Sequence, residues 1–166
     1  MGLEFPNRVG LAAGMDKEGN ATDAFMNLWF GHVEVWTVVP EPQAWNEQPR
    51  LFRLEDHQAI INRMGFNSPG MGEVVSNLTK RRVDGILGVN LWKNATTLNE
   101  DAVDDYEKVL EGTYEHGDYF VVNISSPNTK WLRDLQHVDA CEALLTQVIA
   151  KRDELAKEWV RKPLAV

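Results

Sequence analysis

Polar and charged side chains stand at the ends of four short apolar segments of the sequence. The first segment ends in Asp16 and Lys17, the second at Thr37, the third at Asn90, and the fourth runs into residues 123–129. If these segments are parallel strands, their carboxyl ends meet at the edge of the sheet where α/β proteins bind ligands. Amides, hydroxyls and lysines gathered there predict a site for a planar polar ligand or a phosphorylated cofactor. The alternative at any single end is a helix cap or a turn, but four such ends favour a binding site.

The apolar segments alternate with helical patterns, and this alternation predicts βα units that form a parallel sheet. We expect strands near residues 8–14, 32–39, 85–91 and 119–125, and the start of a fifth at 163–166. Residues 50–63 predict a β-hairpin inserted after the second strand. Apolar stripes with helical spacing separate the strands: Ala21, Ala24, Phe25, Leu28 and Trp29; Met71, Val74, Val75 and Leu78; Ala102, Tyr106, Val109, Leu110 and Tyr114; and Cys141, Leu144, Leu145, Val148, Leu155 and Trp159.

The length limits the architecture that these elements can form. A chain of 166 residues predicts a single domain, here residues 1–166. A closed (β/α)8 barrel, the TIM barrel, typically takes about 250 residues, so four βα units are too few for one. The fold class is therefore α/β, either as an open doubly wound sheet or as half of a TIM barrel with an inserted hairpin.

Charge and composition exclude several classes of protein. Asp and Glu number 25 against 17 Lys and Arg, and the net charge of −8 argues against a nucleic-acid partner. Cys141 is the only cysteine, which excludes an intrachain disulfide, and the four histidines show no metal-ligand spacing. No apolar run is long enough for a membrane helix, and the first residues lack a signal-peptide pattern. We therefore expect a soluble, cytoplasmic chain with no metal site and no membrane segment.

Four motifs carry a resemblance to a known family. They are Gly-Leu-Ala-Ala-Gly-Met-Asp-Lys at 10–17, Pro-Arg-Leu-Phe-Arg-Leu at 49–54, Ile-Asn-Arg-Met-Gly-Phe-Asn at 61–67 and Asn-Ile-Ser-Ser-Pro-Asn-Thr at 123–129. In this order they resemble dihydroorotate dehydrogenase, in its quinone-linked, membrane-associated class. The resemblance implies a flavin-dependent (β/α)8 barrel of pyrimidine biosynthesis. This chain resembles the N-terminal half of that barrel, without the family's membrane-binding helices, so the half-barrel is the favoured architecture.

The resemblance also implies roles for the matching residues. Ser126 would be the general base that removes a proton from the substrate as a hydride passes to the flavin. Because a neutral serine is a weak base, this role needs a proton relay and a desolvated site. Contacts to the flavin, FMN, are implied for Ala13, Gly14, Lys17, Thr37, Asn90 and Asn123. Contacts to dihydroorotate or orotate are implied for Lys17, Asn62, Arg63, Met64, Gly65, Phe66, Asn123 and Asn128.

Tryptophans mark most of the positions at which this chain departs from the family pattern. The pattern has glycine at Trp29, Trp36, Trp92 and Trp131, Pro-Gly at Ala44 and Trp45, proline at Lys130 and threonine at Val39. Glycine lets a backbone approach a ligand or adopt positive φ, whereas tryptophan fills space and disfavours that conformation. Neutral drift and selected or engineered filling are the alternatives, and repetition of one bulky residue favours filling. We therefore expect Trp36 and Trp92 to occupy flavin volume, and no FMN to be bound.

Three functions compete at this point. The first is a non-catalytic half-barrel, engineered or excised from a dihydroorotate dehydrogenase, that forms a homodimer because an apolar inner sheet face needs cover. The second is a flavoenzyme half that oxidises dihydroorotate to orotate with FMN once a partner chain completes its site. The third is a small-ligand module that keeps weak flavin affinity without turnover. We favour the first, because the tryptophans obstruct the flavin side of the site.

Overall fold

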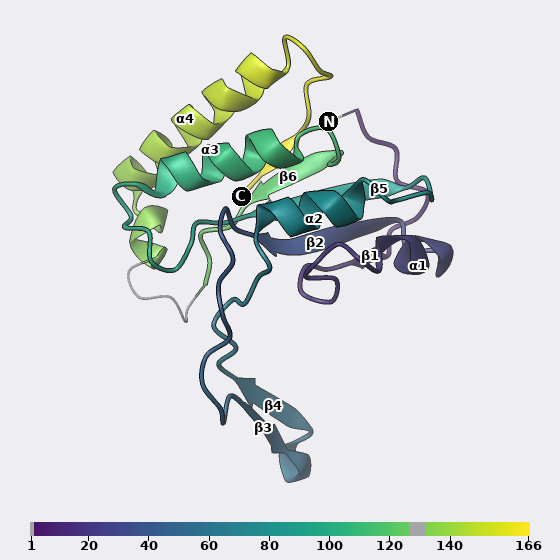
Figure 1. Ribbon diagram of the computed structural model, residues 1–166, viewed down its shortest axis with the longest axis vertical. Coiled ribbons are helices and arrows are strands. Elements are labelled where there is room, and N and C mark those ends of the chain that lie inside the picture. Colours follow the sequence, from purple (N-terminus) through teal and green to yellow (C-terminus); the bar gives the residue numbers. More distant parts are fainter. Residues whose placement is uncertain (1, 127–131) are drawn as a thin grey trace.

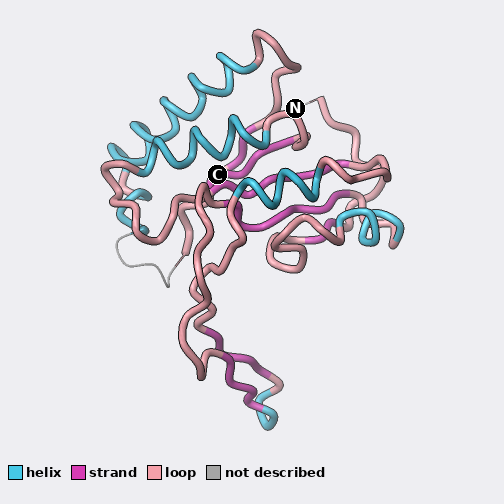
Figure 2. The backbone as a smooth tube through the Cα atoms, in the orientation of Figure 1, coloured by secondary structure: helices cyan, strands magenta, loops and turns pink. Residues whose placement is uncertain are grey.

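The computed structural model describes residues 2–126 and 132–166, which form a parallel sheet, a hairpin and four α-helices (Figures 1 and 2). The larger sheet has the strand order β1-β2-β5-β6-β7, and every neighbouring pair is parallel. Its strands are β1 (Gly10–Leu11), β2 (His32–Val38), β5 (Ile86–Leu91), β6 (Tyr119–Val122) and β7 (Leu164–Ala165). The α-helices are α1 (Thr22–Asn27), α2 (Met71–Leu78), α3 (Ala102–Thr113) and α4 (Val138–Leu155). The predicted α/β fold, with four parallel strands and the beginning of a fifth, is confirmed.

The predicted hairpin forms the second sheet and projects away from the body of the molecule (Figure 1). Strand β3 (Leu51–Leu54) pairs antiparallel with β4 (Ala59–Asn62), and a short 3₁₀ helix (Glu55–His57) makes the turn between them. Both strands are exposed along their whole length. A two-stranded ribbon is marginal by itself, so the flanking chain matters: Gln43 and Ser68 bridge the two segments that lead into and out of the hairpin.

The hydrophobic core lies between the larger sheet and helices α2, α3 and α4, which cover one of its faces (Figure 1). The sheet contributes Val35, Val89 and Phe120, which have no exposed surface. Helix α3 contributes its whole predicted stripe, namely Ala102, Tyr106, Val109, Leu110 and Tyr114, all of them buried. Full burial of a large apolar side chain stabilises a fold by about 1.5–3 kcal/mol. The helical period of the sequence therefore identified the face of α3 that holds the core together.

The predicted stripe of the first helix is wrong. Helix α1 ends at Asn27, so Leu28 and Trp29 lie beyond it, and their exposed fractions are 68% and 85%. The helix buries Thr22 and Met26 instead. The cause is local, because Trp29 has a φ of 68°, in the left-handed region that ends a helix and that glycine adopts most easily.

The last helix is shorter than its apolar pattern predicted. Helix α4 ends at Leu155, and Trp159 lies beyond it with an exposed fraction of 44%. Leu144 and Val148 are buried, and the remaining stripe residues within the helix pack against the core. The stripe is therefore correct as far as the helix extends.

The inner face of the sheet, on the side away from the helices, carries a hydrogen-bonded polar group of residues beside the apolar Trp36 and Val121, so the expectation of an apolar face is only partly correct. Alternation along β2 directs Val33 and Val35 to the core, so Glu34 between them faces the opposite way. The same alternation along β5 and β6 gives this face Asn90 and Tyr119. Both donate hydrogen bonds to the Glu34 carboxylate. This face therefore satisfies much of its own hydrogen bonding.

The longest described helix, α4, has 18 residues and is too polar for the interior of a membrane. Within residues 2–126 and 132–166, no helix has the length and apolarity to cross a membrane. The same residues bring together no group of three His, Cys, Asp or Glu side chains that could hold a metal ion.

Self-association stays a prediction. It rests on the open edges at β1 and β7 and on the helix-free face of the sheet. We expect size-exclusion chromatography with light scattering, at micromolar concentrations, to give the mass of a dimer. A monomer mass that persists as the concentration is raised would contradict it.

Replacing Trp29 with glycine should stabilise the fold. The left-handed conformation costs a residue with a Cβ about 1 kcal/mol, and an indole that is 85% exposed gains little from burial. We expect Trp29→Gly to raise the free energy of unfolding by up to about 1 kcal/mol in urea denaturation. Trp159→Gly is the control, because Trp159 is also exposed but has no positive φ. An equal gain in both variants would show that backbone strain is not the cause.

Candidate functional site

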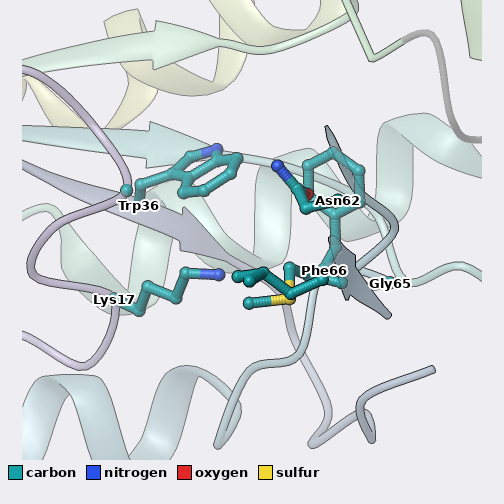
Figure 3. Close-up of a pocket in the computed structure, with 8 residues that line it drawn as sticks. Lys17, Trp36, Asn62, Gly65 and Phe66 are labelled. Carbon is teal, nitrogen blue, oxygen red and sulfur yellow. The ribbon is translucent and has the colours of Figure 1, made fainter. Parts of the chain in front are cut away.

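A cavity of about 260 Å³ lies where the loop after β1, strand β2 and the base of the hairpin meet (Figure 3). Its lining residues are Gly14, Lys17, Trp36, Leu51, Asn62, Met64, Gly65 and Phe66. Figure 3 shows Lys17 and Trp36 on one side of the cavity, and Asn62 and Phe66 on the other. Most of the residues implied to contact the substrate therefore line the same cavity, although they come from distant parts of the chain.

Other predicted site residues are described but do not line this cavity: Ala13, Thr37, Arg63, Asn90, Asn123 and Ser126. Arg63 is exposed and turns toward the hairpin base, where its guanidinium donates to the Pro49 carbonyl at 2.9 Å. Ser126 is buried, with an exposed fraction of 5%. Asn128, Lys130 and Trp131 lie outside the described residues.

A buried carboxylate, Asp16, fixes the loop that carries Lys17. It is 2% exposed and accepts hydrogen bonds from the backbone N–H groups of Asn20 and Ala21 and from the Thr22 hydroxyl, the last at 2.9 Å. These groups lie just before α1 and at its first residue, so Asp16 holds the turn that leads into the helix. Its carbonyl also accepts the Trp36 N–H at 3.4 Å. Asp16 thus ties the Lys17 loop both to α1 and to β2.

The opposite wall is a tight turn held by a second stretch of chain. Gly65 and Phe66 have φ angles of 89° and 54°, so two successive residues adopt the left-handed region. A Cβ at Gly65 would lie 2.6 Å from the Asn46 side chain, and only glycine allows this approach. Gln43 Nε2 donates to the Phe66 carbonyl at 2.6 Å, and the Asn46 N–H donates to the Met64 carbonyl at 2.9 Å. Gln43 and Asn46 therefore shape the wall, and neither was predicted as a site residue from the sequence.

The Lys17 ammonium lies among aromatic rings rather than carboxylates. Its Nζ is 4.9 Å from the centroid of Trp36 and 5.5 Å from that of Trp45. Its hydrogen bond to Asn67 Oδ1 is long, at 3.4 Å, and no carboxylate among the described residues forms an ion pair with it. Burial lowers the pKa of Lys17 from its ordinary value. The cavity therefore presents a partly desolvated cation that can pair with an anionic group of a ligand.

Three aromatic rings pack in series beside this cation. The ring of Phe66 lies edge-on to Trp36 at 5.5 Å and tilted against Trp92 at 4.3 Å. Trp92 is 1% exposed and belongs to the core, whereas Trp36 lines the cavity. Ring atoms of Trp36 lie 2.9 and 3.0 Å from the point that a Cβ on Gly14 would occupy. The Trp36 indole therefore covers Gly14 directly.

The sequence has clear relatives among known proteins. The sequence profile of the dihydroorotate dehydrogenase family matches residues 1–166. The chain belongs to the dihydroorotate dehydrogenase family. It is 51% identical over 157 residues to a dihydroorotate dehydrogenase (quinone) of Saccharophagus degradans, covering 95% of this chain and 46% of that protein. It is 52% identical over 167 residues to the Neisseria meningitidis protein of the same name, covering 100% of this chain and 50% of the relative.

A solved structure of a family member shows the same fold. The Eimeria tenella dihydroorotate dehydrogenase, in complex with ferulenol, superimposes with a TM-score of 0.84 at 41% identity. The match covers 93% of this chain and 43% of that chain. The family members are TIM barrels, and this chain spans about half the length of the relatives it matches.

The family uses FMN, and the residues implied to contact it can be tested against the structure. Gly14 is covered by the Trp36 indole. The side-chain amides of Asn90 and Asn123 are hydrogen-bonded to each other at 3.0 Å. Thr37 differs, because its buried Oγ1 has no hydrogen-bond partner among the described residues. With the indole on Gly14, these residues do not fit a flavin that lies against the loop after β1.

Removing the Asp16 carboxylate should loosen the Lys17 loop. Asp16→Ala leaves the N–H groups of Asn20 and Ala21 and the Thr22 hydroxyl without their acceptor, at a cost of about 1–3 kcal/mol. We expect urea denaturation to show this loss in the free energy of unfolding. Asp56→Ala is the matched control, because Asp56 is exposed in the hairpin turn. Equal effects of the two substitutions would refute the anchoring role of Asp16.

Proposed function

We propose that this chain binds an orotate-class ligand, a planar ring that bears a carboxylate, and that alone it does not oxidise dihydroorotate. The observation that carries the proposal is that one cavity joins the Lys17 ammonium to a wall formed by Asn62 and residues 64–66. The relatives' names support the choice of ligand class, since they are dihydroorotate dehydrogenases.

The side chains that line the cavity can pair with the chemical groups of such a ligand. The Lys17 ammonium, which has no carboxylate partner among the described residues, would pair with the ligand's carboxylate. The Asn62 amide offers one donor group and one acceptor, which match the alternating N–H and C=O groups at the edge of a pyrimidine ring. The rings of Phe66 and Trp36 line the cavity and would exclude water from the bound ligand. Binding is thus a matter of one charge pair, amide hydrogen bonds and aromatic contact.

The absence of turnover is proposed because of Trp36. Its indole covers Gly14, the residue against which the family resemblance places the flavin. Oxidation needs substrate, base and hydride acceptor in close mutual geometry, and loss of one component removes far more than its share of the activity. Ser126 keeps the residue type implied for the base. The engineered origin of the tryptophans stays a hypothesis.

A second candidate is FMN-dependent oxidation of dihydroorotate when a partner chain completes the site. The observation in its favour is Thr37, one of the residues implied to contact the flavin, whose buried hydroxyl has no hydrogen-bond partner among the described residues. A buried hydroxyl left unpaired costs free energy that a bound polar group would recover. The test is to add dihydroorotate, FMN, a quinone and the remaining part of a family member to the chain. Formation of orotate in this mixture would support this candidate over the first.

Orotate binding tests the principal proposal. We expect isothermal titration calorimetry to detect binding to the unaltered chain and to lose it in Lys17→Met. Affinity should fall as the pH rises through the lowered pKa of Lys17, below the ordinary 10.5, because the neutral amine no longer attracts a carboxylate. Lys80→Met is the control, because Lys80 is exposed and lies outside the cavity. If Lys17→Met and Lys80→Met bind orotate equally, the ligand is not held by Lys17.

Opening the space over Gly14 should change flavin affinity. We expect Trp36→Gly to bind FMN, seen as quenching of flavin fluorescence, whereas the unaltered chain leaves the fluorescence unchanged. Trp45→Gly is the matched control, because Trp45 also lies near Lys17 but does not line the cavity. Tight FMN binding by the unaltered chain would contradict the blocking role of Trp36. Formation of orotate from dihydroorotate by the unaltered chain, with FMN and a quinone added, would contradict the absence of turnover.

A further inference from the structure

One side-chain amide, that of Gln43, joins the wall of the cavity to the loop between β5 and α3. Gln43 Nε2 donates to the Phe66 carbonyl at 2.6 Å. Its Oε1 accepts from Asn94 Nδ2 at 3.1 Å and from the Ala95 N–H at 3.0 Å. Phe66 lines the cavity, whereas Asn94 and Ala95 do not. The amide therefore connects a wall residue to a part of the chain that lies outside the cavity.

The loop between β5 and α3 is itself held by the core helix α3. This helix buries its apolar stripe, and its Asp105 accepts from the Asn94 N–H at 2.8 Å and from the Thr97 hydroxyl at 2.7 Å. Asn94 is 7% exposed, and its side chain pairs with the N–H and the carbonyl of Glu41 at 3.0 and 2.9 Å. The support that Gln43 offers to the wall thus comes from the core of the molecule and not from the exposed hairpin.

Phe66 has a backbone conformation that needs such support. Its φ of 54° lies in the left-handed region, which is unfavourable for a residue with a Cβ. Within residues 2–126 and 132–166, Gln43 provides the one donor to its carbonyl. The backbone bridge between Gln43 and Ser68 lies two residues further along. The Phe66 ring packs on Trp36 and Trp92, so its place at the cavity depends on a carbonyl held by one side chain.

The two ends of the Gln43 amide face partners that differ in kind. The Phe66 carbonyl can only accept a hydrogen bond, and the Ala95 N–H can only donate one, so both ends fix the same orientation. An ionised glutamate has nearly the same shape but can only accept. At this position it would keep the bonds from the loop and turn an oxygen toward the Phe66 carbonyl with no proton between them. A protonated glutamate would regain the donor and match the glutamine.

We propose that Gln43 is a positioning residue, which holds Phe66 at the cavity by tying its carbonyl to the loop between β5 and α3. Gln43 does not line the cavity, so it acts on a ligand only through Phe66. Its bearing on ligand binding rests on the proposed function, whereas the hydrogen-bond pattern does not.

The test reads the Phe66 carbonyl carbon by nuclear magnetic resonance in labelled protein. In the unaltered chain we expect a scalar coupling across the hydrogen bond between Gln43 Nε2 and this carbon. In Gln43→Glu we expect the carbon shift to differ from that of the unaltered chain at pH 8 and to return to it as the glutamate is protonated. Burial and the facing carbonyl favour the neutral form, so the pKa of this glutamate should lie above its ordinary value of about 4.3.

Two control variants separate this effect from others. Gln43→Leu cannot donate at any pH, so its Phe66 carbon shift should stay displaced throughout. It retains Asp105 and Glu41, as well as Lys108, whose ammonium pairs with Glu41 at 2.7 Å, so any titration of these groups would appear in it too. Gln147→Glu adds the same charge on the exposed side of α4 and should leave the carbon shift unchanged at every pH.

Orotate titration of the same variants connects the hydrogen bond to the ligand. We expect Gln43→Glu to bind orotate about tenfold more weakly than the unaltered chain at pH 8, and to recover as the glutamate is protonated. Gln147→Glu should bind orotate as the unaltered chain does. If the unaltered chain does not bind orotate, the proposed function fails, whereas the Phe66 carbon shift still decides the role of Gln43.

Three outcomes would overturn the positioning role. The first is the lack of the scalar coupling in the unaltered chain, which would decide the matter even if no variant folds. The second is a folded Gln43→Glu whose Phe66 carbon shift matches the unaltered chain at pH 8 or does not return to it on protonation. The third is an equal return in Gln43→Leu, because the pH dependence would then belong to the neighbouring acidic groups.

Discussion

The parallel register of β2, β5 and β6 is the constraint on which the core and the site both depend. Val35 pairs with Val89, and Val89 pairs with Phe120, so three fully buried side chains lie side by side beneath the helices. The same register places Glu34 and Asn90 on the opposite face and brings the strand ends to one edge. A slip of one residue would exchange the two faces. It would expose the core valines and bury a carboxylate among the helices.

One residue type, tryptophan, has three different physical consequences in this molecule. Trp29 is exposed and stores backbone strain, because its φ is positive. Trp36 lies on Gly14 and fills space at the cavity. Trp92 is buried in the core against Phe66. A single purpose does not account for all three, since only Trp36 acts directly on the cavity. Removing Trp92 would open the core, with the large cost of an aromatic deletion.

The sequence predicted the elements whose patterns are long and regular. Helix α3 repeats its apolar period over 12 residues, and the whole stripe is buried. Helix α1 has six residues, too few for periodicity to locate its end, and the conformation of Trp29 decides it. The polar residues of the inner face were not predicted, because a truncated barrel was assumed to have an apolar interior. The sequence did contain a signal for them, since Glu34 stands between two valines.

The same distinction applies to the candidate site. Lys17, Asn62 and residues 64–66 were predicted, because they belong to motifs that are contiguous in sequence, whereas Arg63 of the same motif turns toward the hairpin base. Gln43 and Asn46 were missed because their partners lie 17 to 23 residues away across the hairpin, a pairing that only the folded chain creates. Asp16 was visible as a polar strand end, and its hydrogen bonds reach only four to six residues ahead. Its anchoring role could have been predicted from that spacing.

The polar inner face also changes what association of this chain requires. A second copy that covered Glu34, Asn90 and Tyr119 would meet side chains that already hydrogen-bond to one another and offer a partner little further hydrogen bonding. Apolar surface is instead exposed on the hairpin, where Phe52 stands opposite Ile61 with exposed fractions of 42% and 56%. Apolar driving force for association is therefore available at the hairpin, and unpaired backbone hydrogen-bonding groups are available at the sheet edges β1 and β7. A contact that used the sheet alone would be directional but weak, since hydrogen bonds exchanged with water contribute little net free energy.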